Sequence, residues 1–277
     1  MSAQINNSEW RARLLLTYRK RDEKTVLAGR EHYGPLTVQK PFYPEADVCH
    51  TYLLHPPGGI APGDHLSLNI VLEDAAEVLV TTPAAGKFYR CDHRGSSLQQ
   101  HIHLARGSAL EWLPQESIAF NNCSAEVLTR VELADTARFF GWDMVCLGRP
   151  ASGEAFTGGN FRQRFELWRE GRPLLLERSL YSGGADALHK PWGLNGHTVA
   201  GTLIANYADE SALQTARMVC ETGGGASSAA TLVEDFLVCR CLADSAETVR
   251  NGFIELWTAL RPLLFGREGT VPRIWNT

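Results

Sequence analysis

The sequence predicts a mainly β protein of the α+β class, with layered antiparallel sheets and a small C-terminal strand-helix-strand-helix portion. Extended segments in which apolar and polar residues alternate recur from Trp10 to about Leu180. Gly, Pro, Asp or Asn separates these segments, as is typical of turns between strands. The final third instead contains stretches with the 3.6-residue period of a helix. We therefore expect a single domain over residues 1–277, with a β body at 10–195 and an α/β tail at 196–277 packed on it.

The composition indicates a globular, cytoplasmic protein. The 277 residues are 44% hydrophobic and 21% charged, which is ordinary for a globular domain. A formal net charge of -4 gives no electrostatic basis for binding nucleic acid or an anionic membrane. No apolar run approaches the ~20 residues that span a bilayer, and the N-terminus lacks the apolar stretch of a signal peptide. The seven cysteines have no framework spacing, which argues against a secreted disulfide scaffold.

The strands of the body are expected to form antiparallel sheets packed in layers. Residues 161–168 and 174–180 flank Glu170-Gly171, which predicts a hairpin with Gly171 at its tip. No repeat of fixed period is visible, so neither a propeller nor a solenoid is predicted. The other strands are expected at 48–54, 66–72, 78–82, 98–104, 127–133 and 139–147.

The tail is expected to begin with a strand at 198–207, followed by a short helix. Asp209 is in position to cap this helix, because its carboxylate can accept hydrogen bonds from the first free amides. The glycine run that starts at Gly223 then ends the helix.

A second strand is expected at 232–242, followed by a longer helix. Asp244 and Glu247 have the spacing of a capping box at the start of that helix. The apolar side chains that follow share one face, and the helix is expected to end near Pro262 and Gly266.

Three segments share one design: an apolar strand ends on Pro or Gly and is followed by polar or charged groups. They are residues 55–64 (HPPGGIAPGD), 81–90 (TTPAAGKFYR) and 111–121 (EWLPQESIAFN). In the third segment Pro114 ends the strand because it lacks an amide donor. Polar groups held at strand ends are common in functional sites and also in simple turns.

Together these three segments resemble the family of the urease accessory protein UreD, called UreH in some organisms. Three further segments are also similar to that family: Gly34–Tyr43, Leu147–Pro150 and Pro272–Trp275. The similarity extends from near residue 10 to the C-terminus, with the motifs in the same order.

The resemblance implies a scaffold in urease maturation and not an enzyme. Such a protein would act with the accessory protein UreF and the GTPase UreG, bind apo-urease and help deliver nickel to its active site. It would hold no stable cofactor, although Ni²⁺ could bind transiently. The absence of a Gly-x-x-x-x-Gly-Lys-Ser/Thr motif agrees with this, since nucleotide binding would belong to the partner.

Carboxylates on apolar strands are the leading candidates for a nickel route. Asp143, Glu177 and Glu111 each lie in an apolar strand, where an ionised group is costly unless it is paired or binds metal. The alternative for all three is a structural ion pair with a buried arginine. Asp64 and Glu45 are expected near an entrance to the route.

A β-rich metal-dependent hydrolase is the alternative function. His101 and His103 have a His-X-His spacing that is found in metal sites, although exposed surface histidines would show the same spacing. Cys91 and His93 could also hold a soft divalent ion, but neither motif fixes a complete set of ligands. A third possibility is a protein-binding module without metal contact.

The remaining candidates are motif residues whose role is either conformational or in partner binding. The turn at His55, Gly58 and Gly59 is built from residues that fix or free φ. Lys87 is either an anion ligand or a solvated loop lysine. The other members of this group are Tyr89, Arg90, Gln115 and Glu116.

Overall fold

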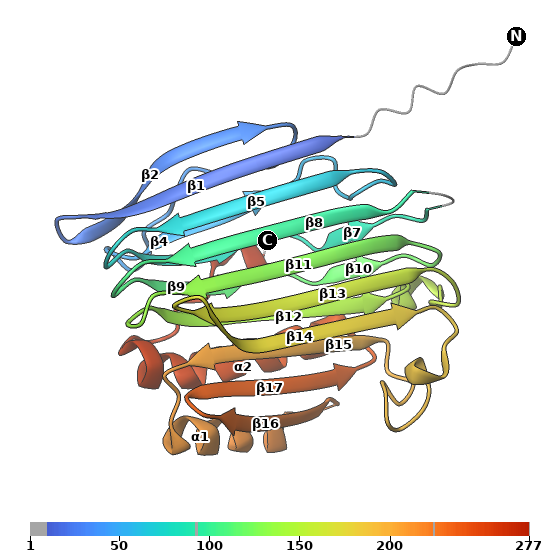
Figure 1. Cartoon of the computed structure of the whole chain (residues 1–277). Coiled ribbons are helices and arrows are strands. Elements are labelled where there is room, and N and C mark those ends of the chain that lie inside the picture. The colour runs from blue at the N-terminus through green and yellow to red at the C-terminus, as the bar shows by residue number, and fades with distance from the viewer. Residues whose placement is uncertain (1–9, 92–93, 224, 277) are drawn as a thin grey trace, which may run out of the picture.

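The computed structural model describes residues 10–91, 94–223 and 225–276, and contains two β-sheets and two helices (Figure 1). The seven-stranded sheet contains β1 (Arg11–Arg21), β2 (Lys24–Tyr33), β5 (His65–Leu72), β8 (Ser96–Leu104), β11 (Ser124–Leu133), β13 (Asn160–Arg169) and β14 (Arg172–Ser182). The ten-stranded sheet contains β3 (Thr37–Val38), β4 (Cys49–Leu54), β6 (Glu77–Thr81), β7 (Gly86–Phe88), β9 (Ala109–Leu113), β10 (Ser117–Ala119), β12 (Arg138–Leu147), β15 (Val199–Asn206), β16 (Ser227–Val233) and β17 (Phe236–Ala243). The helices are α1 (Glu210–Thr222) and α2 (Ala246–Phe265).

The mainly β fold is confirmed, but the prediction of antiparallel sheets is only partly right. In the seven-stranded sheet β1, β5, β8, β11 and β13 run parallel to one another, and β4, β6, β9 and β12 do so in the other sheet. From β4 to β13 the chain winds back and forth between the two sheets (Figure 1). Each turn of this coil adds one strand to the seven-stranded sheet and one to the row β4, β6, β9 and β12, and two of the turns add a further short strand, β7 or β10, to the ten-stranded sheet. The body is therefore solenoid-like, contrary to our expectation. Antiparallel pairs lie toward the ends of each sheet.

The repeat was hidden because its period varies. Cys49 pairs with Val78, Val78 with Leu110 and Leu110 with Phe139, so successive coils are about 30 residues long, within the usual range for solenoid repeats. In the other sheet the last coil is longer, since Val127 pairs with Gln163 across the loop that precedes β13. Alternation of apolar and polar residues indicates that one face of a strand is buried. It does not indicate whether the neighbouring strand is parallel or antiparallel.

The predictions of single turns and helices were more accurate than the prediction of how the strands pair. The hairpin at Gly171 is confirmed, with Glu170 and Gly171 both at positive φ (48° and 73°), as a type I′ turn requires. The helix α1 is confirmed, and the Asp209 side chain accepts a hydrogen bond from the Ala212 amide at 2.9 Å.

Two details of the tail were wrong. The strand expected at 232–242 is a hairpin of β16 and β17, whose turn contains Glu234 at φ 53°. The residue that caps α2 is Ser245, and Asp244 instead contacts His197 Nδ1 at 3.0 Å. The predicted end of this helix is confirmed, because α2 contains Pro262 in its last turn and ends at Phe265, before Gly266 at φ 67°.

Two cores lie on opposite faces of the ten-stranded sheet. One core fills the space between the two sheets, and the other lies between the ten-stranded sheet and the two helices. Along β12, Phe139, Val145 and Leu147 face the first core, whereas Phe140 and Trp142 face the second. The tail continues the ten-stranded sheet, because β15 pairs directly with β12. Within the described residues, no helix is both long and apolar enough to cross a membrane.

Candidate functional site between the sheets

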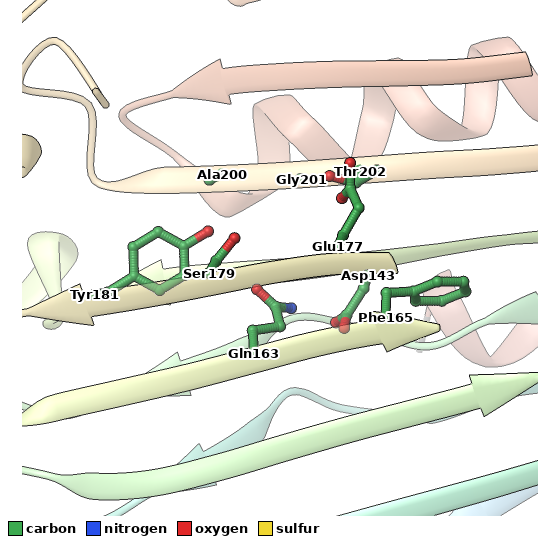
Figure 2. Close-up of a pocket in the computed structure, with 9 residues that line it drawn as sticks. All are labelled: Asp143, Gln163, Phe165, Glu177, Ser179, Tyr181, Ala200, Gly201 and Thr202. Carbon is green, nitrogen blue, oxygen red and sulfur yellow. The ribbon is translucent and has the colours of Figure 1, made fainter. Parts of the chain in front are cut away.

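Asp143 lies in the row of β12 side chains that faces the other sheet, because side chains alternate between the two faces of a strand. It lines a cavity of about 30 Å³ together with Gln163 and Tyr181 from β13 and β14 and with Gly201 and Thr202 from β15 (Figure 2). By volume this cavity could hold roughly one water molecule or ion. A carboxylate is thus placed in a small polar space at the end of an otherwise apolar inter-sheet core.

The Asp143 carboxylate is not fully satisfied by the protein. Its Oδ2 atom is buried and has no hydrogen-bond partner in the structure. Burial raises the pKa of Asp143 to about 7, against hydrogen bonds from Gln163 and the Met144 amide, and the charge of Glu177 raises it further. A buried polar atom without a partner costs about 1–3 kcal/mol, so the cavity favours a proton, a water or a cation at this oxygen.

Glu177 lines the same cavity from β14. Its side chain is 19% exposed and forms an ion pair with Arg240 on β17. Glu177, Tyr181 and Thr202 also line a groove of about 500 Å³, which contains Arg240 as well. The structure therefore brings together the two leading carboxylates, and Glu177 stands between the Asp143 cavity and this groove.

The pKa of Asp143 has a measurable consequence for stability. Folded Asp143 keeps its proton up to about pH 7, whereas an unfolded aspartate loses it near pH ~4. Unfolding therefore releases a proton between these values, and the free energy of unfolding falls as the pH rises through this window. Between pH 5 and 7.5 we expect wild type to lose about 2–3 kcal/mol of its free energy of unfolding relative to Asp143→Asn, which has no titrating group at this position. Urea denaturation at both pH values measures it, and an unchanged difference would contradict the assignment.

Asp64 lies elsewhere, in the turn that precedes β5. It is 5% exposed, and its carboxylate accepts hydrogen bonds from the amides of Trp10 (3.2 Å) and Ala61 (2.9 Å). These bonds hold the turn in place, so its oxygens already have partners. The nearby His55 side chain is different, because its Nε2 atom is buried without a partner, and burial lowers the pKa of His55 in spite of the charge of Asp64.

A second, mostly apolar cavity of about 360 Å³ contains several motif residues. His55, Gly58, Gly59 and Lys87 line it, so the segments 55–64 and 81–90 meet there. Backbone hydrogen bonds join them, with the Ile60 amide donating to the Lys87 carbonyl at 2.7 Å. A side chain on Gly59 would lie 2.5 Å from the ring of Tyr89. Gly59 thus allows the backbone to pack closely against Tyr89. This agrees with the interpretation in which the turn residues have a conformational role.

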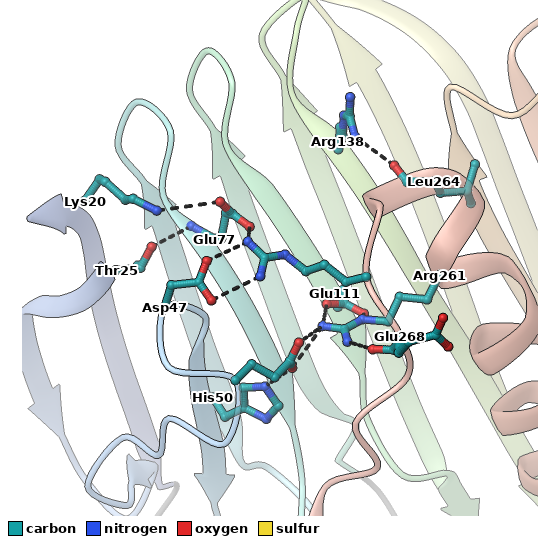
Figure 3. A network of polar contacts seen from close by, with 12 residues as sticks. Lys20, Thr25, Asp47, His50, Glu77, Glu111, Arg138, Arg261, Leu264 and Glu268 are labelled. Carbon is teal, nitrogen blue, oxygen red and sulfur yellow. Dashed lines mark hydrogen bonds and ion pairs between the residues drawn. The ribbon is translucent and has the colours of Figure 1, made fainter. Parts of the chain in front are cut away.

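Glu45 and Glu111 both form ion pairs with Arg261, which Figure 3 shows beside Glu111. The Arg261 side chain is 0% exposed and donates to Glu111 at 2.9 Å through both Nε and Nη2, and to Glu45 Oε1 at 2.9 Å. His50 also contacts Glu45, at 2.7 Å. Burial alone would raise the pKa of Glu45, but the hydrogen bond to His50 and the nearby Arg261 lower it below its usual value. The structural alternative, an ion pair with a buried arginine, therefore describes the surroundings of Glu111.

The C-terminal segment makes further contacts with the first coils. Arg267 pairs with Asp47 at 2.6 Å and with Glu77 at 2.7 Å; Figure 3 shows these two carboxylates close together. The indole of Trp275 donates to the Thr81 hydroxyl at 2.8 Å. These contacts tie the end of the chain to strands from its first third.

Gln115 and Glu116 are held by α2. Arg250 donates to Gln115 Oε1 at 3.1 Å and to Glu116 Oε2 at 3.4 Å, and Glu116 is 8% exposed. Arg90, by contrast, is exposed. Gln115 and Glu116 thus join the β9 strand end to the helix layer.

The histidine pair lies on the outer face of the seven-stranded sheet. His103 is exposed, with Glu132 Oε2 3.9 Å from its Nδ1, and His101 is flanked by Asn69 and Arg130 on the neighbouring strands. A flanking cation disfavours metal binding. Among the described residues, no group of three or more His, Cys, Asp or Glu could hold a metal ion. His93 lies outside the described residues. The Cys91 thiol donates a hydrogen bond to the Arg94 carbonyl and accepts one from the Arg94 amide at 2.9 Å.

Sequence reasoning missed Gln163, Tyr181 and Arg261. For Arg261 a signal existed: it follows Trp257 by four residues, on the buried face of α2, where a charge requires a partner. For Gln163 and Tyr181 no local signal existed, because polar residues at alternate strand positions are ordinary on a solvated face.

These features define a scaffold with a solenoid of β-strands and a carboxylate cavity between its sheets. Comparisons with known proteins agree in assigning a family. A family model described as UreD urease accessory protein matches residues 11–276. The chain therefore belongs to the UreD family, whose members are accessory proteins and not enzymes.

Individual relatives are similar over nearly their full length. Urease accessory protein UreD of Azoarcus sp. (strain BH72) is 44% identical over 272 residues, covering 97% of this chain and 94% of the relative. That of Pseudomonas paraeruginosa (strain DSM 24068 / PA7) is 46% identical over 272 residues, covering 97% and 95%. That of Citrobacter koseri (strain ATCC BAA-895 / CDC 4225-83 / SGSC4696) is 42% identical over 271 residues, covering 97% and 92%.

Proposed function

We propose that this protein is a scaffold in urease maturation that, with UreF-type and UreG-type partners, binds apo-urease and helps to deliver Ni²⁺. The ion is a cargo that is held transiently. Asp143 carries the proposal, because it offers a buried oxygen without a partner, in a cavity that it shares with Glu177. Membership of the UreD family supports the connection with urease.

The chemistry of the cavity suits transfer better than storage. Nickel is a borderline ion that accepts oxygen as well as nitrogen ligands. Conduction requires a site that binds the ion well enough to admit it and weakly enough to release it. Asp143 and Glu177 supply such a site, with the proton of Asp143 leaving as the ion arrives.

The other carboxylates are less suited to this role. Glu111 and Glu45 are both paired with Arg261, and Asp64 accepts hydrogen bonds from two backbone amides. Adding a cation at these positions would require existing bonds to break, which costs about 1.5–3 kcal/mol for each bond to a charged group. We therefore place the route at Asp143 and Glu177 and assign the other three carboxylates to the framework.

Reconstitution tests this function. Apo-urease, the UreF-type and UreG-type partners, GTP, bicarbonate and Ni²⁺ are combined with and without this chain. We expect urease activity and bound nickel to remain near background when the chain is omitted, and apo-urease to co-purify with the complete set. Equal activation without the chain would refute the scaffold role. The chain by itself should show no GTP turnover.

A further inference from the structure

Three thiols gather where α1 packs on the tail of the ten-stranded sheet. Cys239 and Cys241 lie on one face of β17 and are 1% and 3% exposed. Cys220, near the end of α1, is half-buried and packs against the same core. The Cys220 and Cys239 side chains are hydrogen-bonded to each other. Two thiols that are 19 positions apart in the chain, one on a helix and one on a strand, therefore lie within hydrogen-bonding reach of each other.

A small oxidant can reach this contact. Cys220 and Cys241 line a cavity of about 230 Å³ between the two helices and β16–β17, which also contains Ser228 and Asn251. This space is several times the volume that holds one water molecule. Cys220 is therefore presented to a cavity large enough for a peroxide, whereas Cys239 lies behind it in the core.

The two thiols are not equivalent. The hydrogen bond from Cys239 lowers the pKa of Cys220, although burial opposes this shift. The same bond, together with burial, raises the pKa of Cys239. The thiolate is the reactive form of cysteine. Negative charge thus develops on the accessible sulfur, and the proton stays on the buried one.

We propose that Cys220 and Cys239 form a reversible disulfide when the protein meets a peroxide. The Cys220 thiolate attacks one peroxide oxygen, so that an S–O bond forms, the O–O bond breaks and the released hydroxide becomes water. Cys239 then attacks the sulfur of this sulfenic acid, an S–S bond forms, and the S–O bond breaks to release the second water. Two thiols lose two electrons in total, and the peroxide accepts them.

The disulfide would fix α1 to β17 and close the loop that contains β16. A cross-link of this kind restricts the unfolded chain more than the folded one. Oxidation should therefore stabilise the tail without moving it far, because the two thiols already lie within hydrogen-bonding reach of each other. The site is separate from the Asp143 cavity, and its oxidation does not depend on the proposed role in nickel delivery.

Peptide mapping of the full-length chain tests the proposal. The purified protein is treated with a small excess of hydrogen peroxide, its free thiols are alkylated, and it is digested under non-reducing conditions. We expect the number of free thiols to fall by two from the seven in the sequence, one cross-linked peptide pair containing Cys220 and Cys239, recovery with dithiothreitol, and a higher melting temperature of the oxidised form.

Matched variants identify the pair. Cys220→Ser and Cys239→Ser should each abolish the cross-link, and Cys239→Ser should leave a trappable sulfenic acid on Cys220. Cys241→Ser should retain the cross-link, because Cys241 shares the cavity but receives a hydrogen bond from Ser228 at 3.2 Å. Seven free thiols after oxidation, a link that involves Cys241, or sulfenic acid on wild-type Cys220 without a link would overturn the proposal.

Discussion

Replacing Asp143 with Asn is expected to reduce nickel loading of urease by about 10- to 100-fold, the usual cost of disturbing a metal site. Asn has nearly the same shape as Asp but cannot ionise, so the variant should fold and bind its partners while losing the negative oxygen that attracts the ion. Glu177→Gln should also reduce nickel loading of urease. Bound nickel per urease, measured with urease activity in the reconstituted system, gives the result.

Two control variants separate the cavity from general effects of charge. Arg240→Gln breaks the same ion pair as Glu177→Gln but keeps the carboxylate, so nickel loading should be maintained. Glu126→Gln removes a carboxylate that pairs with Arg164 at 2.6 Å and does not line the cavity. If Asp143→Asn activates urease at the normal rate, the route lies elsewhere. If that variant aggregates or loses its partners, Asp143 belongs to the framework.

Replacing Arg261 with Gln should have the largest effect on stability, about 3–5 kcal/mol, because it leaves two carboxylates without their buried cation. At roughly 2–4 °C per kcal/mol, the melting temperature should fall by about 10 °C. Thermal unfolding of the purified complex with the UreF-type partner, followed by circular dichroism, measures this change.

Two comparisons make the Arg261 result specific. Arg267→Gln removes a half-exposed arginine from the same segment and should cost only about 1 kcal/mol. Adding Glu111→Gln to Arg261→Gln should restore part of the lost stability, since it removes a buried charge that has lost its partner. If Arg261→Gln melts within 2 °C of wild type, the network is not a major source of stability.

The local elements of this fold could be predicted from the sequence, whereas their pairing could not. The hairpin at Gly171 and the cap at Asp209 follow from the needs of a few adjacent residues. The parallel pairing of Cys49 with Val78 depends on contacts between distant segments, and an apolar alternation looks the same in either strand direction. The turn at Glu234 was missed because a non-glycine residue adopts the left-handed conformation there.

The same limit applies to the site. Asp143 could be selected because a carboxylate on an apolar strand is conspicuous in one sequence. Whether it has a partner depends on side chains from β13, β14 and β15. Glu111 was selected for the same reason, as a carboxylate on an apolar strand that needs a partner. Its partner is Arg261, which lies 150 residues away in the sequence. A sequence can thus indicate which charges need a partner without indicating which partner they find.

The attachment of the chain end to the first coils also sets an order of events during synthesis. The contacts of Arg261 with Glu45, of Arg267 with Asp47 and of Trp275 with Thr81 join residues 216, 220 and 194 positions apart. Contacts of such high sequence separation are slow to form, and a chain made from its N-terminus cannot form them until residues 261–275 have left the ribosome. The first coils are therefore translated early but completed last. During that interval Glu45, Asp47 and Glu111 lack their arginines, and the nascent chain is most open to aggregation or to capture by a binding partner.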